Sequence, residues 1–194
     1  MKRTVTIIVV VALLAAVAFW FIGKYNAMVT AEENVTTAWS QVENQYQRRA
    51  DLVPNLVATV KGYAAHESQV FENVTEARAR ATQMTLSADV TPEQLMAYQA
   101  AQGELSQALG RLLALAENYP DLKASQNFRD LQAQLEGTEN RITVARNAFN
   151  EAAKAYNILI RKFPNNIVAG IFGFGPKAYF EADEGAEKAP VVEF

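Results

Sequence analysis

Few side chains in this sequence could do chemistry. Among its 194 residues there is one histidine and no cysteine, which excludes disulfides, thiolate metal sites, iron–sulfur clusters and cysteine nucleophiles. His66 adjoins Glu67, so a general acid–base pair is conceivable. Its place after Gly62, at the end of a helical pattern, favours instead a turn residue that interacts with a helix C-terminus. The Glu-x-x-His pairs of di-iron bundles do not occur, so we expect no catalytic residue, no metal and no cofactor.

A second group of polar side chains lies within apolar helical patterns. If two long helices run antiparallel, these side chains can meet as buried ion pairs and amide contacts that set the helix register, or they can form a partner surface. The alternative is a ligand pocket lined by Arg48, Arg49, Asn55 and Glu139. The whole group consists of Trp39, Arg48, Arg49, Asp51, Asn55, Glu139, Asn140, Arg141, Arg146, Asn150 and Asn157.

The spacing of apolar residues predicts the helices that must position these side chains. Steps of three and four residues recur as coiled-coil seams over residues 35–63, 95–119 and 128–163. The last seam predicts one helix from near Asp121 to Lys162, about 42 residues and 63 Å long. Pro54 is expected to kink the first helix rather than end it, because the seam continues in phase beyond the proline. A shorter pattern over residues 70–84 predicts one more helix.

These helices define the predicted fold class. Short connections place consecutive helices antiparallel, so we expect an all-α chain, with an N-terminal transmembrane helix followed by an up-down-up-down four-helix bundle of long, coiled-coil-like helices. The expected divisions are an anchor at residues 1–23, the bundle at residues 24–163 and an irregular tail at residues 164–194. The fourth helix is long enough to return to the membrane, so its end near Phe163 should lie level with Tyr25.

The tail differs in character from the helices. Three glycines alternate with apolar side chains over residues 170–175, so no regular helix is expected there. The apolar stretch from Ile171 to Phe174 can dock on its own bundle, touch the membrane interface or fill a groove on a neighbouring subunit. The acidic stretch of residues 181–187 is expected to be solvated.

Residues 4–22 carry no charged side chain and are about as long as the ~20 residues that cross a bilayer. A cleavable signal peptide is the rival interpretation, because Lys2 and Arg3 precede the apolar run and small residues surround Val17. The apolar run continues beyond that point to Ile22, and Trp20 suits an interfacial aromatic belt. An uncleaved anchor is therefore expected.

Charge indicates the orientation and excludes one class of partner. Lys2 and Arg3 on the short side outweigh Lys24 on the long side, which favours a cytoplasmic N-terminus and an extracytoplasmic bundle. The excess is small, so the opposite orientation stays open. The formal net charge of −3 gives no basis for binding nucleic acid.

Several blocks of this sequence match one known family. Residues 38–57 read Ala-Trp-Ser-Gln-Val-Glu-Asn-Gln-Tyr-Gln-Arg-Arg-Ala-Asp-Leu-Val-Pro-Asn-Leu-Val and closely resemble the signature of the LemA family of bacterial membrane proteins. Further similar blocks cover residues 60–67, 117–124, 135–142, 145–146, 156–157 and 163–164. The resemblance covers nearly all of the chain. It implies an N-terminal membrane helix and an antiparallel helical bundle, with no catalytic residues to carry over.

Three functional hypotheses remain. The first is a non-enzymatic, single-pass protein of the bacterial inner membrane that binds the bilayer through residues 4–22, self-associates into a homo-oligomeric scaffold and meets other envelope proteins. The second is an anchored receptor or adaptor that binds a small ligand or a partner helix through the bundle. The third is a hydrolase that uses His66.

Overall fold

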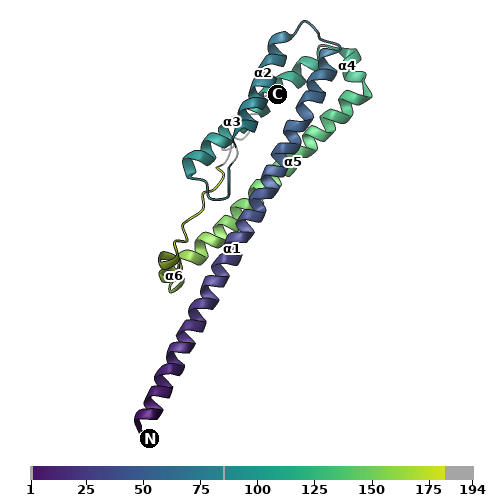
Figure 1. The fold of residues 1–194 in the computed structure, drawn as a ribbon. Helices are drawn as coiled ribbons and strands as arrows, with labels where there is room; N and C mark the ends of the chain where they lie inside the picture. Colours follow the sequence, from purple (N-terminus) through teal and green to yellow (C-terminus); the bar gives the residue numbers. More distant parts are fainter. Residues whose placement is uncertain (1, 85, 182–194) are drawn as a thin grey trace, which may run out of the picture.

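The computed structural model describes residues 2–84 and 86–181, and every regular element within them is a helix. The helices are α1 (Lys2–Lys61), α2 (Ser68–Gln83), α3 (Pro92–Ala116), α4 (Pro120–Ala124), α5 (Gln126–Arg161) and α6 (Asn165–Phe172). The long helices alternate in direction (Figure 1): α1 leads away from the N-terminus, α2 returns partway, α3 turns back again and α5 descends to α6. The prediction of an all-α chain with a long apolar N-terminal helix is confirmed.

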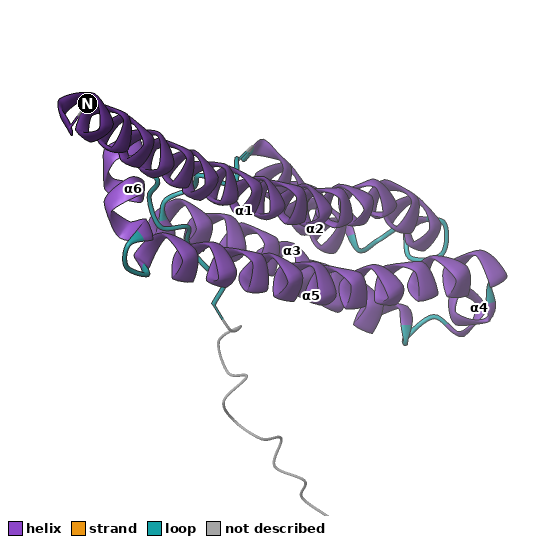
Figure 2. Cartoon of the chain, turned by 90° about the horizontal axis from the view of Figure 1, so that it is seen from below, coloured by secondary structure: helices purple, strands orange, loops and turns teal. Residues whose placement is uncertain are grey.

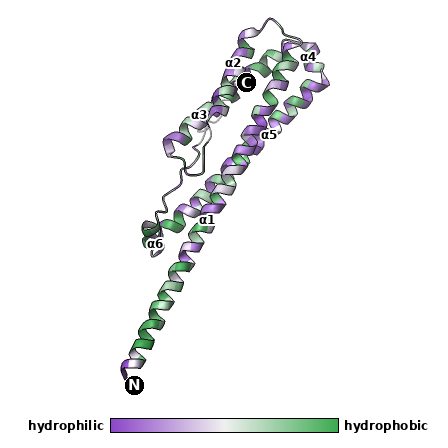
Figure 3. Ribbon diagram, viewed as in Figure 1, coloured by the Kyte–Doolittle hydropathy of each residue, from purple (hydrophilic) through white to green (hydrophobic). Residues whose placement is uncertain are grey.

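Helix α1 joins the predicted anchor to the packed helices without interruption. Its 60 residues span about 90 Å. The apolar N-terminal third projects beyond the other helices (Figure 3), and Met28 is the first buried side chain in the described chain. Among the described helices, α1 is the one long and apolar enough to cross a membrane. The helix also continues through Pro54 to Lys61, as its unshifted seam predicts.

The helices pack as a chain of neighbours. Helix α1 packs along α5 and also contacts α2, while α3 packs chiefly on α2. Figure 2 shows α1 alongside α5, with α6 next to the part of α1 that emerges from the packed region. The rings of Phe172 and Phe174 lie 4.9 and 5.6 Å from the ring of Tyr25, centre to centre. The end of α6 and the chain directly after it therefore lie beside Tyr25 of α1.

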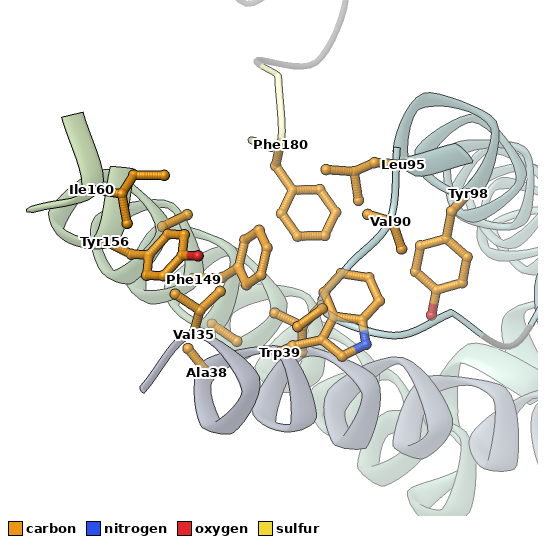
Figure 4. Close-up of a cluster of buried hydrophobic side chains, with 14 of the residues drawn as sticks. Val35, Ala38, Trp39, Val90, Leu95, Tyr98, Phe149, Tyr156, Ile160 and Phe180 are labelled. Carbon is orange, nitrogen blue, oxygen red and sulfur yellow. The ribbon is translucent and has the colours of Figure 1, made fainter. Parts of the chain in front are cut away.

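Buried apolar side chains form two clusters along the helices. The proximal core lies nearer the projecting part of α1 and includes Tyr46. Figure 4 labels its other large aromatic members, which are Trp39, Tyr98, Phe149, Tyr156 and Phe180. The distal core lies toward the opposite end and is mostly aliphatic, with Val53, Leu56, Val74, Leu105, Leu112, Leu122 and Leu135 among its members. The first seam is buried from Val35 to Val60, whereas its last predicted member, Tyr63, is exposed.

The predicted single helix from Asp121 to Lys162 is wrong, because it is divided into α4 and α5. Ser125 has extended backbone, with ψ at 129°, and ends α4. Serine competes for backbone hydrogen bonds and therefore suits such a break. The change in direction at the break accompanies complete burial of Leu122 in the distal core. This long-range contact has no signal in the helical periodicity.

The seam of α5 also drifts near its end. Phe149 and Tyr156 are buried as predicted, but Ala153 and Ile160 are buried in place of the more exposed Ala152 and Leu159. Phe163, which continues the predicted seam, lies beyond α5 and is 81% exposed. A straight helix has 3.6 residues per turn, so a repeat of 3.5 slips around its surface by about 20° per heptad.

The tail is more regular than predicted. Residues 165–172 form α6 despite Gly170, and the fully buried Val168 packs into the proximal core. Burial of this apolar face outweighs the helix-weakening effect of one glycine, which is about 1 kcal/mol. Gly173 ends α6 in the left-handed region, with φ at 78°, and Phe174 donates its N–H to the carbonyl of Ala169 at 3.0 Å. Of the predicted acidic stretch, residues 182–187 lie outside the described residues.

Candidate functional site

A buried arginine separates the two cores. Arg49 on α1 is 2% exposed and donates to Glu139 Oε1 on α5 at 2.9 Å. Its guanidinium also donates to Ser106 Oγ at 2.6 Å and to the carbonyl and side-chain oxygens of Gln102 at 3.1 and 2.5 Å. We call Arg49, Gln102, Ser106 and Glu139 the polar layer. It ties α1, α3 and α5 together at one level.

The polar layer also reaches α2. The Gln102 amide donates to the carbonyl of Ala81 at 3.0 Å, and the guanidinium of Arg49 lies 5.2 Å from the ring centre of Tyr46. On α1 the layer lies between Tyr46 of the proximal core and Val53 of the distal core. Sliding one helix by a turn would leave this buried charge without its acceptors, so the layer favours one register.

The other residues suggested by the sequence are scattered. Trp39 lies in the proximal core, where its indole N–H donates to the carbonyl of Leu86 at 3.2 Å and its ring stacks on Phe180 at 5.9 Å. The side chains that remain on the exposed surface are Arg48, Asp51, Asn55, Asn140 and Arg141. The pocket suggested for Arg48, Arg49, Asn55 and Glu139 is therefore not formed as a unit, because only Arg49 and Glu139 meet.

A second polar system holds the chain that follows α6. Residues 174–181, which we call the strap, run back over the packed helices. Asn157 donates to the carbonyl of Lys177 at 2.9 Å and accepts from its N–H at 2.8 Å. Asn150 makes the same pair of bonds with Phe180, both at 2.9 Å, and Gln99 on α3 pairs with Glu181 at 3.0 and 3.3 Å. Three amide side chains thus bind the strap through its backbone.

Lys177 fixes the strap to two other segments beside the proximal core. Its buried ammonium donates to Glu32 Oε1 of α1 at 2.6 Å and to Asp89 in the connection between α2 and α3. It also lies 5.2 Å from the ring centre of Tyr156. One side chain thereby links the start of the packed part of α1, the α2–α3 connection and the strap.

Burial shifts the pKa values of Lys177 and of two tyrosines in the proximal core. For Lys177, burial alone lowers the pKa, but the hydrogen bonds that its ammonium donates to the carboxylates of Asp89 and Glu32 outweigh burial and raise the pKa. Burial, followed by the negative charge of Glu32, raises the pKa of Tyr156 to about 12. Burial also raises the pKa of Tyr98, with Tyr46 and Glu43 contributing. All three shifts favour the protonated form, which is the charged form of Lys177 and the neutral form of both phenols.

A groove opens between α3 and α5 where the strap ends. It has a volume of about 660 Å³, and Glu181 lies at its edge. Arg49 and Glu139 of the polar layer line it together with Arg146, which donates to the carbonyl of Glu181 at 2.9 Å. Most of the residues that line the groove are polar or charged, and both helices contribute to it.

No arrangement typical of catalysis surrounds His66. It lies exposed in the turn between α1 and α2, at the end of the molecule away from the projecting helix. The neighbouring Glu67 accepts a hydrogen bond from the hydroxyl of Tyr119 at 3.3 Å. Within residues 2–84 and 86–181, no group of three histidine or acidic side chains is placed to hold a metal ion.

The sequence identified only some of the residues that form the polar layer and that hold the strap. Asn150 and Asn157 could be found because they are seven residues apart beside the α5 seam. Gln102 was not singled out, although its polar side chain interrupts the apolar spacing of residues 95–119. Lys177 and Gln99 had no signal, since one lies in a segment without periodicity and the other resembles any surface glutamine.

Comparisons with known proteins place the chain in a family. A sequence model of the LemA family matches residues 38–194. Magnetosome protein MamQ 2 of Paramagnetospirillum magneticum is 31% identical over 95% of this chain and 75% of its own length, and MamQ of Magnetospirillum gryphiswaldense is 30% identical over 98% and 77%. Protein LemA of Metamycoplasma hominis is 23% identical over 86% and 73%. The matched residues include α1 from Ala38, the polar layer and the strap, and the chain belongs to the LemA family.

Proposed function

We propose that this protein is a single-pass protein of the bacterial inner membrane that acts as a non-enzymatic, self-associating helical scaffold. The observation that carries the proposal is α1, which runs unbroken from an unburied apolar third into the packed cores. Its residues 4–22 have no charge and, at about 28 Å, match the ~30 Å hydrocarbon core of a bilayer. An apolar surface of this size that none of the described residues covers is best accommodated by lipid.

The region beside the anchor supports contact with a membrane surface. Lys24 lies 5.8 Å from the ring centre of Trp20, and aromatic rings with nearby cations are typical of the headgroup region. Apolar side chains at the same end of the molecule are exposed, namely Phe163, Ile167, Ile171 and Phe172. The proximal end of the packed helices would therefore rest on the bilayer.

The buried polar groups support a structural rather than a catalytic role. The Nη atoms of Arg49 and the Nζ atom of Lys177 donate to groups of the same protein, and the Asn157 amide is bonded to the strap. The packing of α1, α2, α3 and α5, with a groove between α3 and α5, supports an antiparallel four-helix bundle that is open on one side. A rigid bundle on a continuous helix suits a protein that presents surfaces to envelope partners.

Membrane insertion can be tested with two matched substitutions of exposed valines. Val9→Arg places a charge in the anchor, at a cost of about 3 kcal/mol for insertion, whereas Val144→Arg places the same charge on the surface of α5. Alkaline carbonate extraction of membranes should release the Val9→Arg protein and retain the Val144→Arg protein. Equal retention of both would remove the support for an anchor.

Orientation and self-association need separate measurements. The chain has no cysteine, so Asn147→Cys on the exposed face of α5 gives a single reporter for a membrane-impermeant maleimide. We expect labelling in intact spheroplasts, because positive charge precedes the anchor; labelling only after lysis would reverse the orientation. Light scattering of the detergent-extracted protein should give particles of more than one chain, and a strict monomer would contradict the scaffold.

The groove favours a second candidate function, an anchored adaptor that binds an extended polypeptide. Its volume of about 660 Å³ lies within the range of ligand sites, and the adjacent amide side chains already hold an extended backbone. Thermal-shift measurements with extended peptides and with metabolites would separate the two candidates. Stabilisation by a peptide would favour the adaptor, and no shift with either class would favour the scaffold.

A further inference from the structure

Helix α6 is apolar on two faces, and only one of them is buried. Val168 is fully buried in the proximal core, and the side-chain amide of Asn165 donates to the carbonyl of Leu159 on α5 at 3.0 Å. Another face carries Ile167 and Ile171, which are one turn apart and 49% and 64% exposed. The helix has no charged side chain. Its packing on the bundle therefore holds an apolar face outward.

The exposed face of α6 lies at the level where α1 leaves the predicted anchor. Tyr25 comes three residues after the charge-free run of residues 4–22, and its ring contacts the rings of Phe172 and Phe174. Phe21, which still belongs to the charge-free run, packs against the proximal core. Three residues of helix rise about 4.5 Å, so α6 lies close to the end of the anchor along α1 (Figure 3).

The chain around α6 is basic. Residues 152–180 include four basic residues and no acidic one. Two of the basic residues, Arg161 and Lys162, are exposed and directly precede Phe163, which is 81% exposed. The first charge on α1 after the anchor is also basic, at Lys24. Exposed aromatic rings beside cations are typical of the boundary between acyl chains and anionic headgroups.

We propose that residues 161–172, which we call the interfacial segment, are a second membrane contact that lies in the headgroup–acyl boundary beside the anchor. Arg161 and Lys162 bind anionic phospholipid headgroups. The side chains that enter the acyl region are those of Phe163, Ile167, Ile171 and Phe172. The inference rests on the proposed anchoring by α1, because an inserted α1 brings this segment to the bilayer.

The interfacial segment determines how the bundle stands on the membrane. A single helix can turn about its own axis in a bilayer, and its rotation and tilt are set by its packing and by interfacial side chains. Packed helices lie about 8–10 Å apart, so a contact at α6 is displaced to one side of α1. Two contacts at different distances from the axis fix both the rotation and the direction of tilt. The bundle then presents the same faces to neighbouring membrane proteins.

Spin labels at single cysteines test this contact in the full-length protein. The chain has no cysteine, so Ile171→Cys labels the interfacial segment, Val9→Cys labels the anchor, and Val144→Cys labels a similarly exposed position on α5. Val144 lies 17 residues before the end of α5, a distance of about 26 Å along the helix. It is therefore the control for a side chain away from lipid.

The measurement compares access of oxygen, which partitions into acyl chains, with access of a water-soluble nickel chelate. The protein is placed in vesicles of phosphatidylcholine and phosphatidylglycerol. The ratio of oxygen to nickel access should be about tenfold higher at Ile171 than at Val144, because an interfacial helix buries its apolar face about 5–10 Å deep. The ratio at Val9 should be the highest of the three.

The three labels separate failure of the interfacial segment from failure of the anchor. Lipid access at both Val9 and Ile171 supports the proposal. Lipid access at Val9 with water access at Ile171 overturns the proposal and leaves the anchor intact. Low access of both reagents at Ile171 also overturns it, because a second protein chain would then cover this face. Water access at Val9 overturns the anchor and the interfacial segment together.

Lipid composition tests the role of the two basic residues. In vesicles of phosphatidylcholine alone, the oxygen-to-nickel ratio at Ile171 should fall about threefold, because the attraction to anionic headgroups is lost. Arg161→Gln combined with Lys162→Gln should give the same low ratio in both lipid mixtures. The matched control is Lys61→Gln with Arg111→Gln, which removes two exposed charges toward the opposite end of the bundle. Equal dependence on anionic lipid in both double variants would overturn the headgroup contact.

Discussion

The proximal and distal cores are built from different kinds of contact. The proximal core joins aromatic rings from α1, α3, α5 and the strap, and its edge contains the ion pairs of Lys177 and the amide bonds of Asn157. The distal core joins mainly Val, Leu and Ala side chains. Aliphatic packing tolerates changes in shape, whereas hydrogen bonds and stacked rings require one geometry. We infer that both cores supply stability and that the proximal core in addition specifies how the strap and the anchor helix are joined.

The largest expected effect distinguishes the two cores by removing one large side chain from each. Phe149→Ala should cost about 4 kcal/mol and Leu112→Ala about 3 kcal/mol, because both side chains are fully buried. Phe149 contacts the rings of Trp39 and Phe180, so its loss should also free the strap. Chemical unfolding of the full-length protein in detergent measures the stability, and hydrogen exchange at residues 177–181 measures the strap. Equal strap exchange in both variants would contradict the division.

The next effect concerns the polar layer between the cores. Arg49→Ala removes the donor that satisfies Glu139, Gln102 and Ser106, and should cost about 3 kcal/mol. Arg49→Met refills the space with apolar atoms and should cost less than about 1 kcal/mol, since Glu139 is partly exposed and can be hydrated. Unfolding free energies of both variants test this. If methionine costs as much as alanine, the layer contributes stability rather than register.

A smaller effect is expected from one strap clamp. Asn157→Ala leaves the N–H and carbonyl of Lys177 without partners and should cost about 2 kcal/mol. Hydrogen exchange should increase in the strap but not in the distal core. Asn140→Ala is the control, because Asn140 lies on the exposed surface of the same helix. Faster exchange in both cores after Asn157→Ala would show that the strap is not a separate unit.

The smallest effect at neutral pH is expected for Tyr156→Phe. The buried Tyr156 hydroxyl has no hydrogen-bond partner among the described residues, so its removal should change stability by less than about 1 kcal/mol.

At alkaline pH the same substitution has a larger consequence. The folded-state pKa of Tyr156 is raised from 10.0 to about 12, so the native state holds its proton more tightly, and stability falls as pH rises through that range. The raised pKa of Lys177 acts in the same direction. Tyr156→Phe should lose less stability than the parent between pH 10 and 12, as followed by thermal unfolding. A parallel loss in both proteins would contradict the shift.

The sequence was most informative where local spacing decides structure. The seam of α1 identified the buried positions from Val35 to Val60, and it singled out Arg49 as the one polar member. The sequence placed Arg49 and Glu139 in one group of polar residues that could meet between antiparallel helices, but only the structure pairs these two. The break at Ser125 and the helix through Gly170 were not predictable in this way, since each accompanies burial of one side chain, Leu122 or Val168, against distant parts of the chain.

By itself, the sequence determined that the chain is helical, which faces of the long helices are buried, and that the first third of α1 is apolar enough for a bilayer. These properties follow from the order of neighbouring residues along a helix with a fixed pitch. Only the tertiary structure decided that Asn150, Asn157 and Gln99 hold the strap and that Lys177 joins Glu32 to Asp89. Extended backbone has no helical period, and the free energy of those contacts depends on segments that meet across as many as 145 residues.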